Sequence, residues 1–199
     1  MKLKTLFNKA CRQLHSVLGG GNRQNVKIID RGHNNVVQID KSCQIVDLKI
    51  TLNGSNNKIE IKDGCFMNGT NIIYVIGDGN NLVIGKNCSF SGDFHIIPEN
   101  GHNITIGDDC LFAVSSYIRT SDGHPIYNEE GMRINAPKDV VIGNHVWVGQ
   151  RSAIVKGSHI GNGCVVGMMS MANKSYPANT VIAGIPAKVI REKIRWDVK

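Results

Sequence analysis

The sequence predicts an all-β protein whose chain winds into a parallel β-helix, and three observations support this. From Ile142 onward an aliphatic residue recurs every six positions, at Ile142, Val148, Ile154, Ile160 and Val166. Six segments repeat an isoleucine followed four residues later by Cys or Val. The 199 residues include 22 Gly, 21 Asn and 43 Ile or Val but only 6% aromatic residues, which is typical of short strands between tight turns.

Each six-residue unit supplies one short strand and one turn, so three units form one triangular coil. Side chains alternate along a strand, which places both the aliphatic and the Cys or Val position inside. Gly and Asn suit the corners, where positive φ is common. The inward position is occupied by Cys43, Cys65, Cys88, Cys110 and Cys164. We expect small core residues there rather than zinc ligands, because the sequence has no CxxC pair.

The net charge of +7 is concentrated at the two ends of the chain: residues 1–31 carry +6, residues 186–199 carry +3 and residues 32–185 carry −2. A near-neutral body argues against a nucleic-acid partner. Residues 2–18 predict a basic amphipathic helix that either packs on the body or contacts an anionic membrane surface.

A glycine hinge follows this helix, so we expect an N-terminal segment at 1–21 and a β-helix domain at 22–199. A continuous apolar signal sequence is missing, which favours the cytoplasm, with the inner face of the membrane as a variant. The ending Arg191–Trp196 predicts a short helix that closes the coil.

The repeat is interrupted once. Six-residue steps continue to Ile118, but the next three land on His124, Glu130 and Ala136, and the pattern resumes at Val140. We therefore expect residues 119–139 to leave the coil as a loop. An excursion from a rigid scaffold is a common place for function.

Three segments resemble the hexapeptide-repeat O-acetyltransferase family, and the resemblance covers roughly residues 30–190. Thr120–Pro125 (TSDGHP) is similar to the catalytic loop of that family, and Ile142–Gly149 (IGNHVWVG) is similar to the segment after it. Ala183–Ile190 (AGIPAKVI) is similar to its C-terminal signature. The resemblance implies left-handed coils, acetyl-CoA as the acyl donor, no metal, and a homotrimer with sites between subunits.

By this resemblance His124 is the general base. It would remove the proton of a sugar hydroxyl as that hydroxyl attacks the thioester, a role worth roughly 10²–10⁴-fold in rate. Asp122 either orients the imidazole or caps the turn before Gly123. Trp147 is expected to form a wall of the site, because an exposed Trp is costly without a contact. His95 and Asp93, one coil earlier, contact the acceptor or are surface residues.

The resemblance also implies coenzyme A contacts at Gln150, Met168, Asn173, Lys174 and Arg191. Lys174 and Arg191 suit phosphate groups, and Lys188 is a further candidate. Met168 replaces the usual small residue and Asn173 the usual hydroxyl, so their contacts would run through the backbone. The alternative for each basic residue is a solvated surface charge.

We therefore expect acetyl transfer to a sugar hydroxyl of a bacterial surface polysaccharide (capsule, O-antigen or exopolysaccharide) or of its precursor. One alternative is a small acceptor, namely a free sugar, serine or an antibiotic. Another is a non-catalytic β-helix that binds a glycan. A metal enzyme on the same scaffold needs three converging His ligands, whereas His124, His145 and His159 do not share a coil register.

Overall fold

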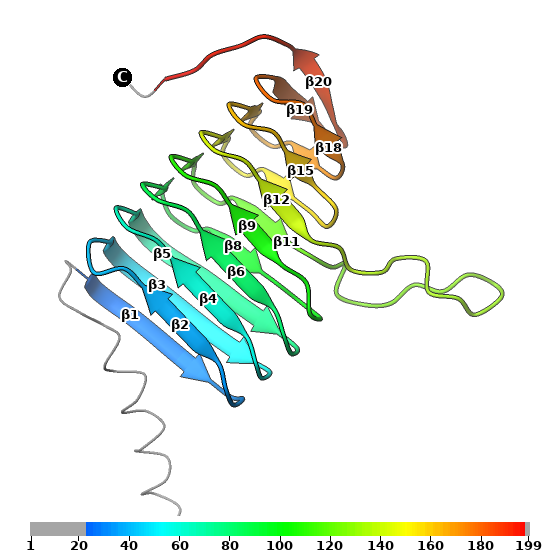
Figure 1. The fold of residues 1–199 in the computed structure, drawn as a ribbon. Helices are drawn as coiled ribbons and strands as arrows, with labels where there is room; N and C mark the ends of the chain where they lie inside the picture. Colours follow the sequence, from blue (N-terminus) through cyan, green and yellow to red (C-terminus); the bar gives the residue numbers. More distant parts are fainter. Residues whose placement is uncertain (1–22, 198–199) are drawn as a thin grey trace, which may run out of the picture.

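The computed structural model describes residues 23–197, which form twenty β-strands and no helix. The strands stack coil upon coil into a parallel β-helix, and one long loop projects from its side (Figure 1). The predicted fold class is confirmed. The predicted helix at residues 2–18 lies outside the described residues. Within residues 23–197, no helix has the length and apolarity needed to cross a membrane.

The coil has three faces. Face 1 is a sheet of seven parallel strands: β2 (Val36–Ile39), β4 (Lys58–Ile61), β6 (Asn81–Ile84), β9 (Ile104–Ile106), β12 (Val140–Ile142), β15 (His159–Ile160) and β18 (Ser175–Tyr176). The other thirteen strands form one sheet that bends around a corner. Two long strands, β3 (Gln44–Asn53) and β5 (Phe66–Ile76), follow this bend. The part of β5 before the bend pairs with β7, and the part after the bend pairs with β8.

Face 2 contains β7 (Ser89–Phe90), β10 (Leu111–Phe112), β13 (Trp147–Val148), β16 (Val165–Val166), β19 (Val181–Gly184) and β20 (Ala187–Arg191). Face 3 contains β1 (Arg23–Asp30), β8 (His95–Ile97), β11 (Tyr117–Arg119), β14 (Ala153–Ile154) and β17 (Met171–Ala172). We call the three edges corner 1–2, corner 2–3 and corner 3–1, after the faces that they join.

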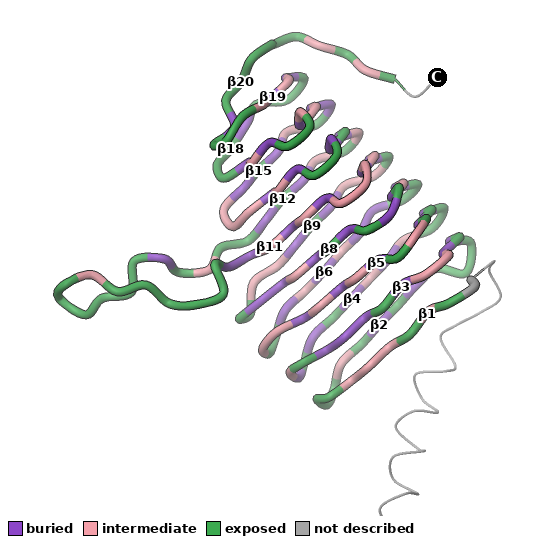
Figure 2. The backbone as a smooth tube through the Cα atoms, turned by 180° about the vertical axis from the view of Figure 1, so that it is seen from behind, coloured by how far each residue is buried: buried purple, intermediate pink, exposed green. Residues whose placement is uncertain are grey.

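The predicted inward positions form the core. The aliphatic series from Ile142 to Val166 is at most 1% exposed at every member. In-register pairing stacks equivalent residues of successive coils, so that Val148 lies between Phe112 and Val166. Figure 2 shows the result as buried segments repeated along the coils, with most of the projecting loop and of the C-terminal segment exposed. The core is therefore a column of aliphatic layers.

The five described cysteines are buried free thiols inside this column. Each thiol donates to a backbone carbonyl in the next coil: Cys43 to Lys62 at 3.1 Å, Cys65 to Gly85 at 3.1 Å, Cys88 to Gly107 at 3.1 Å, Cys110 to Gly143 at 3.2 Å and Cys164 to Pro177 at 3.0 Å. They are structural residues, as predicted. Each thiol therefore gives a carbonyl at corner 1–2 a hydrogen bond that a small apolar side chain in place of Cys could not donate.

The predicted loop leaves the coil between β11 and β12, at corner 3–1. It begins one residue later than expected, at Thr120, because Arg119 completes β11. Its outer part, which we call the arm (residues 126–134), folds back on itself through an antiparallel bridge between Tyr127 and Arg133. Where the two ends of the loop meet, the amide of Lys138 donates to the carbonyl of Thr120 at 3.0 Å. The loop thus has a closed base and a projecting arm (Figure 1).

The predicted C-terminal helix is wrong. After β20, which pairs antiparallel with β19, residues 192–197 run extended across corner 1–2. The amide of Ile194 donates to the carbonyl of Asn179 at 3.0 Å, and the indole of Trp196 stacks on the imidazole of His145. A helix this short would leave its first four amides without an intrahelical partner. In the extended segment the Ile194 amide instead finds an acceptor on the coil, and the Trp196 ring finds an aromatic partner.

Candidate active site

His124 lies at the base of the loop, where the chain passes from the core to the solvent. Thr120 and Ser121 are still buried, and the chain is exposed from Asp122 to Tyr127. Gly123 turns the chain with a φ of 88°, and its amide donates to the Ser121 hydroxyl at 3.0 Å. The turn therefore presents the His124 side chain to solvent on a backbone tied to the coil.

Asp122 is held by residues that the sequence did not single out. Its Oδ2 atom accepts hydrogen bonds from the Lys156 ammonium at 2.5 Å and from the Asn135 amide at 2.9 Å. The Lys156 bond is the main reason that the pKa of Asp122 is lowered. Asn135 also donates to the His124 carbonyl at 2.8 Å. Across the described residues, no hydrogen bond joins the Asp122 carboxylate to the His124 ring.

Lys156 connects the loop to the following coil. It lies at corner 3–1 after β14, and its ammonium also donates to the Asn135 carbonyl at 3.1 Å. Asp122 lies on the outgoing segment of the loop and Asn135 on the returning segment. The Lys156 side chain therefore holds both ends of the loop together near His124.

A buried acidic residue lies below the loop. Glu99 follows β8 at corner 3–1, and its carboxylate forms an ion pair with Arg119 and accepts the hydroxyl hydrogen of Ser121. The hydrogen bond to Glu99 raises the pKa of Arg119 above its usual value. Glu99 was not predicted from the sequence as a residue of the site. Its spacing of 22 residues from Ser121, which equals the coil period of this region, is the signal that could have revealed the contact.

The predicted wall residues lie apart from His124 within one chain. Trp147 points outward from β13 on face 2, where it is 40% exposed. His95 points outward from β8 on face 3 and lies beside Tyr117, with ring centroids 6.5 Å apart. Asp93 is an exposed corner residue with a φ of 52°. The full width of face 3 separates the His124 loop from the corner that follows Trp147.

The residues predicted to hold coenzyme A are exposed and divided between three places. Gln150 and Met168 lie one above the other at corner 2–3, where the amide of Met169 donates to the Gln150 carbonyl at 2.9 Å. Asn173 and Lys174 lie at corner 3–1, on the same edge as the loop. Lys188 and Arg191 lie on β20. A single chain does not gather these residues around His124.

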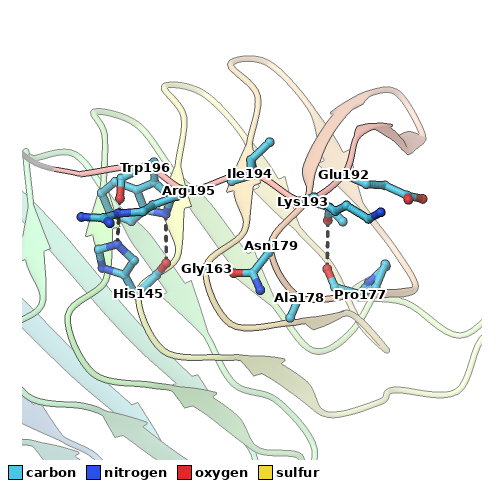
Figure 3. Close-up of a pocket in the computed structure, with 11 residues that line it drawn as sticks. His145, Gly163, Pro177, Ala178, Asn179, Glu192, Lys193, Ile194, Arg195 and Trp196 are labelled. Carbon is cyan, nitrogen blue, oxygen red and sulfur yellow. Dashed lines mark hydrogen bonds between the residues drawn. The ribbon is translucent and has the colours of Figure 1, made fainter.

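A cavity of about 600 Å³ lies elsewhere, between the C-terminal segment and corner 1–2 (Figure 3). It is lined by residues 192–196 together with His145, Gly163 and residues 177–180, and it contains no predicted site residue. Over the same described range, no three His, Cys, Asp or Glu side chains gather into a metal-binding group.

Comparison with known proteins relates the chain to polysaccharide-modifying enzymes, although no protein-family profile matches it. A polysialic acid O-acetyltransferase of Neisseria meningitidis is 41% identical over 146 residues, which cover 63% of this chain and 58% of that protein. A putative lipopolysaccharide biosynthesis O-acetyl transferase of Escherichia coli (strain K12) is 49% identical over 61 residues, 31% of each chain. The chain thus spans less than two thirds of these curated relatives.

The solved structure of the polySia-specific acetyltransferase NeuO matches over a longer range. The TM-score is 0.70 at 31% sequence identity, and the match covers 87% of this chain and 89% of that one. This agreement includes the coils before and after the His124 loop. The chain therefore belongs to the hexapeptide-repeat O-acetyltransferase family, acyltransferases built on a left-handed parallel β-helix.

Proposed function

We propose that this protein transfers the acetyl group of acetyl-CoA to a hydroxyl of a bacterial surface polysaccharide or of its precursor, with His124 as the general base. The observation that carries the proposal is an exposed histidine on a loop whose base is tied to the coil on both sides. The names of its relatives, which act on polysialic acid and in lipopolysaccharide biosynthesis, support a glycan acceptor.

The reaction follows from the chemistry of the acceptor. A sugar hydroxyl is too weakly acidic to ionise at neutral pH, so its proton must leave as its oxygen attacks the thioester carbonyl. His124 accepts this proton while the new C–O bond forms. The C–S bond then breaks, and His124 returns the proton to the departing thiolate. An imidazole can both accept and donate a proton, so one side chain serves both transfers.

The complete site is proposed to lie between subunits of a homotrimer. Within one chain, His124 and Trp147 lie on opposite sides of face 3, so a neighbouring copy has to bring the second wall. The arm also exposes four large apolar side chains, at Ile126, Tyr127, Met132 and Ile134. An exposed apolar cluster of this kind is commonly covered by a partner.

Subunit mixing tests the shared site. Separately purified His124→Ala and Trp147→Ala proteins should each be nearly inactive, because every site lacks either the base or the Trp147 wall. After dissociation and joint reassembly, some interfaces combine His124 of one subunit with Trp147 of another. These sites have both groups again, so activity should return. If reassembly restores nothing while the assembled mass is that of a trimer, the shared site is refuted.

An acceptor panel tests the substrate class. Release of free CoA thiol from acetyl-CoA is measured with polysialic acid, lipopolysaccharide, a simple galactoside, serine and chloramphenicol. We expect turnover on a polymer. Turnover on a small acceptor with none on either polymer would favour the small-acceptor alternative. A protein that neither binds CoA nor transfers acetyl to any acceptor would be a non-catalytic β-helix.

A further inference from the structure

Glu99 is a buried carboxylate directly below the base of the His124 loop. Its side chain is 3% exposed, against 25% for its partner Arg119. The guanidinium binds it twice, from Nε to Oε2 at 2.9 Å and from Nη2 to Oε1 at 2.8 Å. Replacing a buried ion pair by apolar residues of similar volume is often neutral or stabilising. Stability alone therefore does not explain why position 99 carries a charged side chain.

The contacts of Glu99 converge on the residues that lead to His124. The Ser121 hydroxyl donates to Glu99 Oε2 and accepts the amide hydrogen of Gly123 at 3.0 Å. The amide of Glu99 donates to the Thr120 hydroxyl at 2.8 Å. Together these bonds hold each residue from Arg119 to Ser121, and through Ser121 they hold the turn.

Arg119 also supports the turn from below. A Cβ atom at Gly123 would lie 2.9 Å from Arg119 Nη2, so the guanidinium occupies the space under this glycine. Two bonds to Glu99 orient the guanidinium, and its Nη1 also donates to the Tyr117 hydroxyl at 3.3 Å. A change at Glu99 is thus transmitted to the residue preceding His124 by two routes, through Arg119 and through Ser121.

We propose that Glu99 is a positioning residue of the acetyl-transfer reaction, which holds the His124 imidazole in place through Arg119 and Ser121. This inference rests on the proposed function. Glu99 touches no reacting atom in this arrangement, so its effect is geometric. A misplacement of about 1 Å can cost on the order of 10²-fold in rate.

Kinetics of Glu99→Gln provide the first test. The glutamine keeps the size of the side chain but loses the charge that orients Arg119. With acetyl-CoA and polysialic acid as substrates, we expect kcat to fall about 10- to 100-fold while KM for acetyl-CoA is unchanged. The matched control is Glu60→Gln on β4, where the carboxylate is half-buried and pairs with Lys58 at 3.2 Å. A kcat of Glu99→Gln equal to that of this control would overturn the inference.

A second variant separates positioning from folding. Glu99→Met/Arg119→Met replaces the pair by apolar side chains of similar length, so no unpaired charge is left in the interior. We expect its melting temperature to stay near the wild-type value while kcat remains low, because the methionine thioether is only a weak acceptor for the Ser121 hydroxyl hydrogen. A wild-type kcat in this double variant would show that the pair has only a structural role.

A third readout does not depend on the acceptor. Hydrogen exchange of peptides covering residues 119–124 should accelerate in Glu99→Gln but not in Glu60→Gln. Unchanged exchange in this segment overturns the inference whatever the activity. If exchange accelerates as expected but the wild-type protein transfers no acetyl group, the anchoring of the loop stands and the proposed function fails.

Discussion

Replacing Trp196 by alanine is expected to release residues 192–197 from corner 1–2 while the coils stay folded. The indole lies flat on the His145 ring, with centroids 4.1 Å apart and planes inclined by 6° (Figure 3). Its Nε1 donates to the His145 carbonyl at 3.0 Å, and His145 Nε2 donates back to the Trp196 carbonyl at 3.1 Å. The alanine variant keeps only the second of these hydrogen bonds.

The size of the effect follows from the ring stacking and the indole hydrogen bond that the substitution removes. An aromatic pair contributes about 0.5–1.5 kcal/mol, and one hydrogen bond contributes about 0.5–1.5 kcal/mol net. Together they amount to about 1–3 kcal/mol, so local opening of the segment becomes roughly 5- to 150-fold more favourable, at about 1.4 kcal/mol per factor of ten. The global free energy of unfolding changes little, because a terminal segment can open on its own.

Hydrogen exchange at the Ile194 amide measures this opening, since that amide donates to Asn179 in the closed state. The comparison variant is Trp147→Ala, which removes only the tilted aromatic contact with Trp196 at a centroid distance of 6.0 Å, so exchange of the Ile194 amide should increase less. A Trp196→Phe variant keeps an aromatic ring but loses the indole donor, and its exchange should be intermediate. If the amide exchanges equally fast in the Trp196→Ala and Trp147→Ala variants, the reasoning is refuted.

Three further predictions concern the loop and the core. His124→Ala should lower kcat by roughly 10²–10⁴-fold with an unchanged melting temperature, because the side chain is exposed; undiminished CoA release would contradict its role as base. The pKa of Asp122 is lowered by Lys156, so this pair stabilises the loop above the carboxyl's unfolded pKa and ceases to do so as the pH falls through the lowered value. The difference in loop exchange between wild type and Asp122→Asn should therefore be largest at neutral pH and vanish in acid; a difference that persists in acid would argue against the pair. The pKa of the Cys65 thiol is raised to about 12: hydrogen bonding with the Cys43 thiol lowers this pKa, but hydrogen bonding with the Cys88 thiol and burial together raise it more. A thiol reagent at pH 8 should therefore modify Cys65 only after unfolding, as mass mapping of the labelled peptides would show.

The fold was predictable because its period is short and its chemistry is repeated. Aliphatic residues at six-residue steps leave few alternatives for which side chains point inward, and the buried series from Ile142 to Val166 follows this rule. The interruption after Ile118 was equally visible, because His124, Glu130 and Ala136 stand where the six-residue step requires large aliphatic core residues. The sequence therefore predicted both the scaffold and the exposed segment that carries His124.

The supporting residues of the site were not predictable in the same way. Coil lengths vary along the chain, so the coil period that separates Glu99 from Ser121 does not separate the other contacting residues of the site. Arg119 lies 20 residues from Glu99, whereas Lys156 lies 34 residues from Asp122. The separation between Asp122 and Lys156 in the sequence spans the excursion loop, and the length of this loop does not reveal which residues meet at its base.

By itself, the sequence determined the repeating coil, the inward positions and the place where the coil is interrupted, because each depends on neighbours within a few residues. The tertiary structure decided which side chains face each other across coils. In place of the helix expected at Arg191–Trp196, it has the last residue of β20 followed by an extended segment. His145 is 51 residues from Trp196, so this choice depends on a partner that local sequence does not reveal. Burial of Glu99 has the same origin, since stacking of one coil on the next places it beneath the loop.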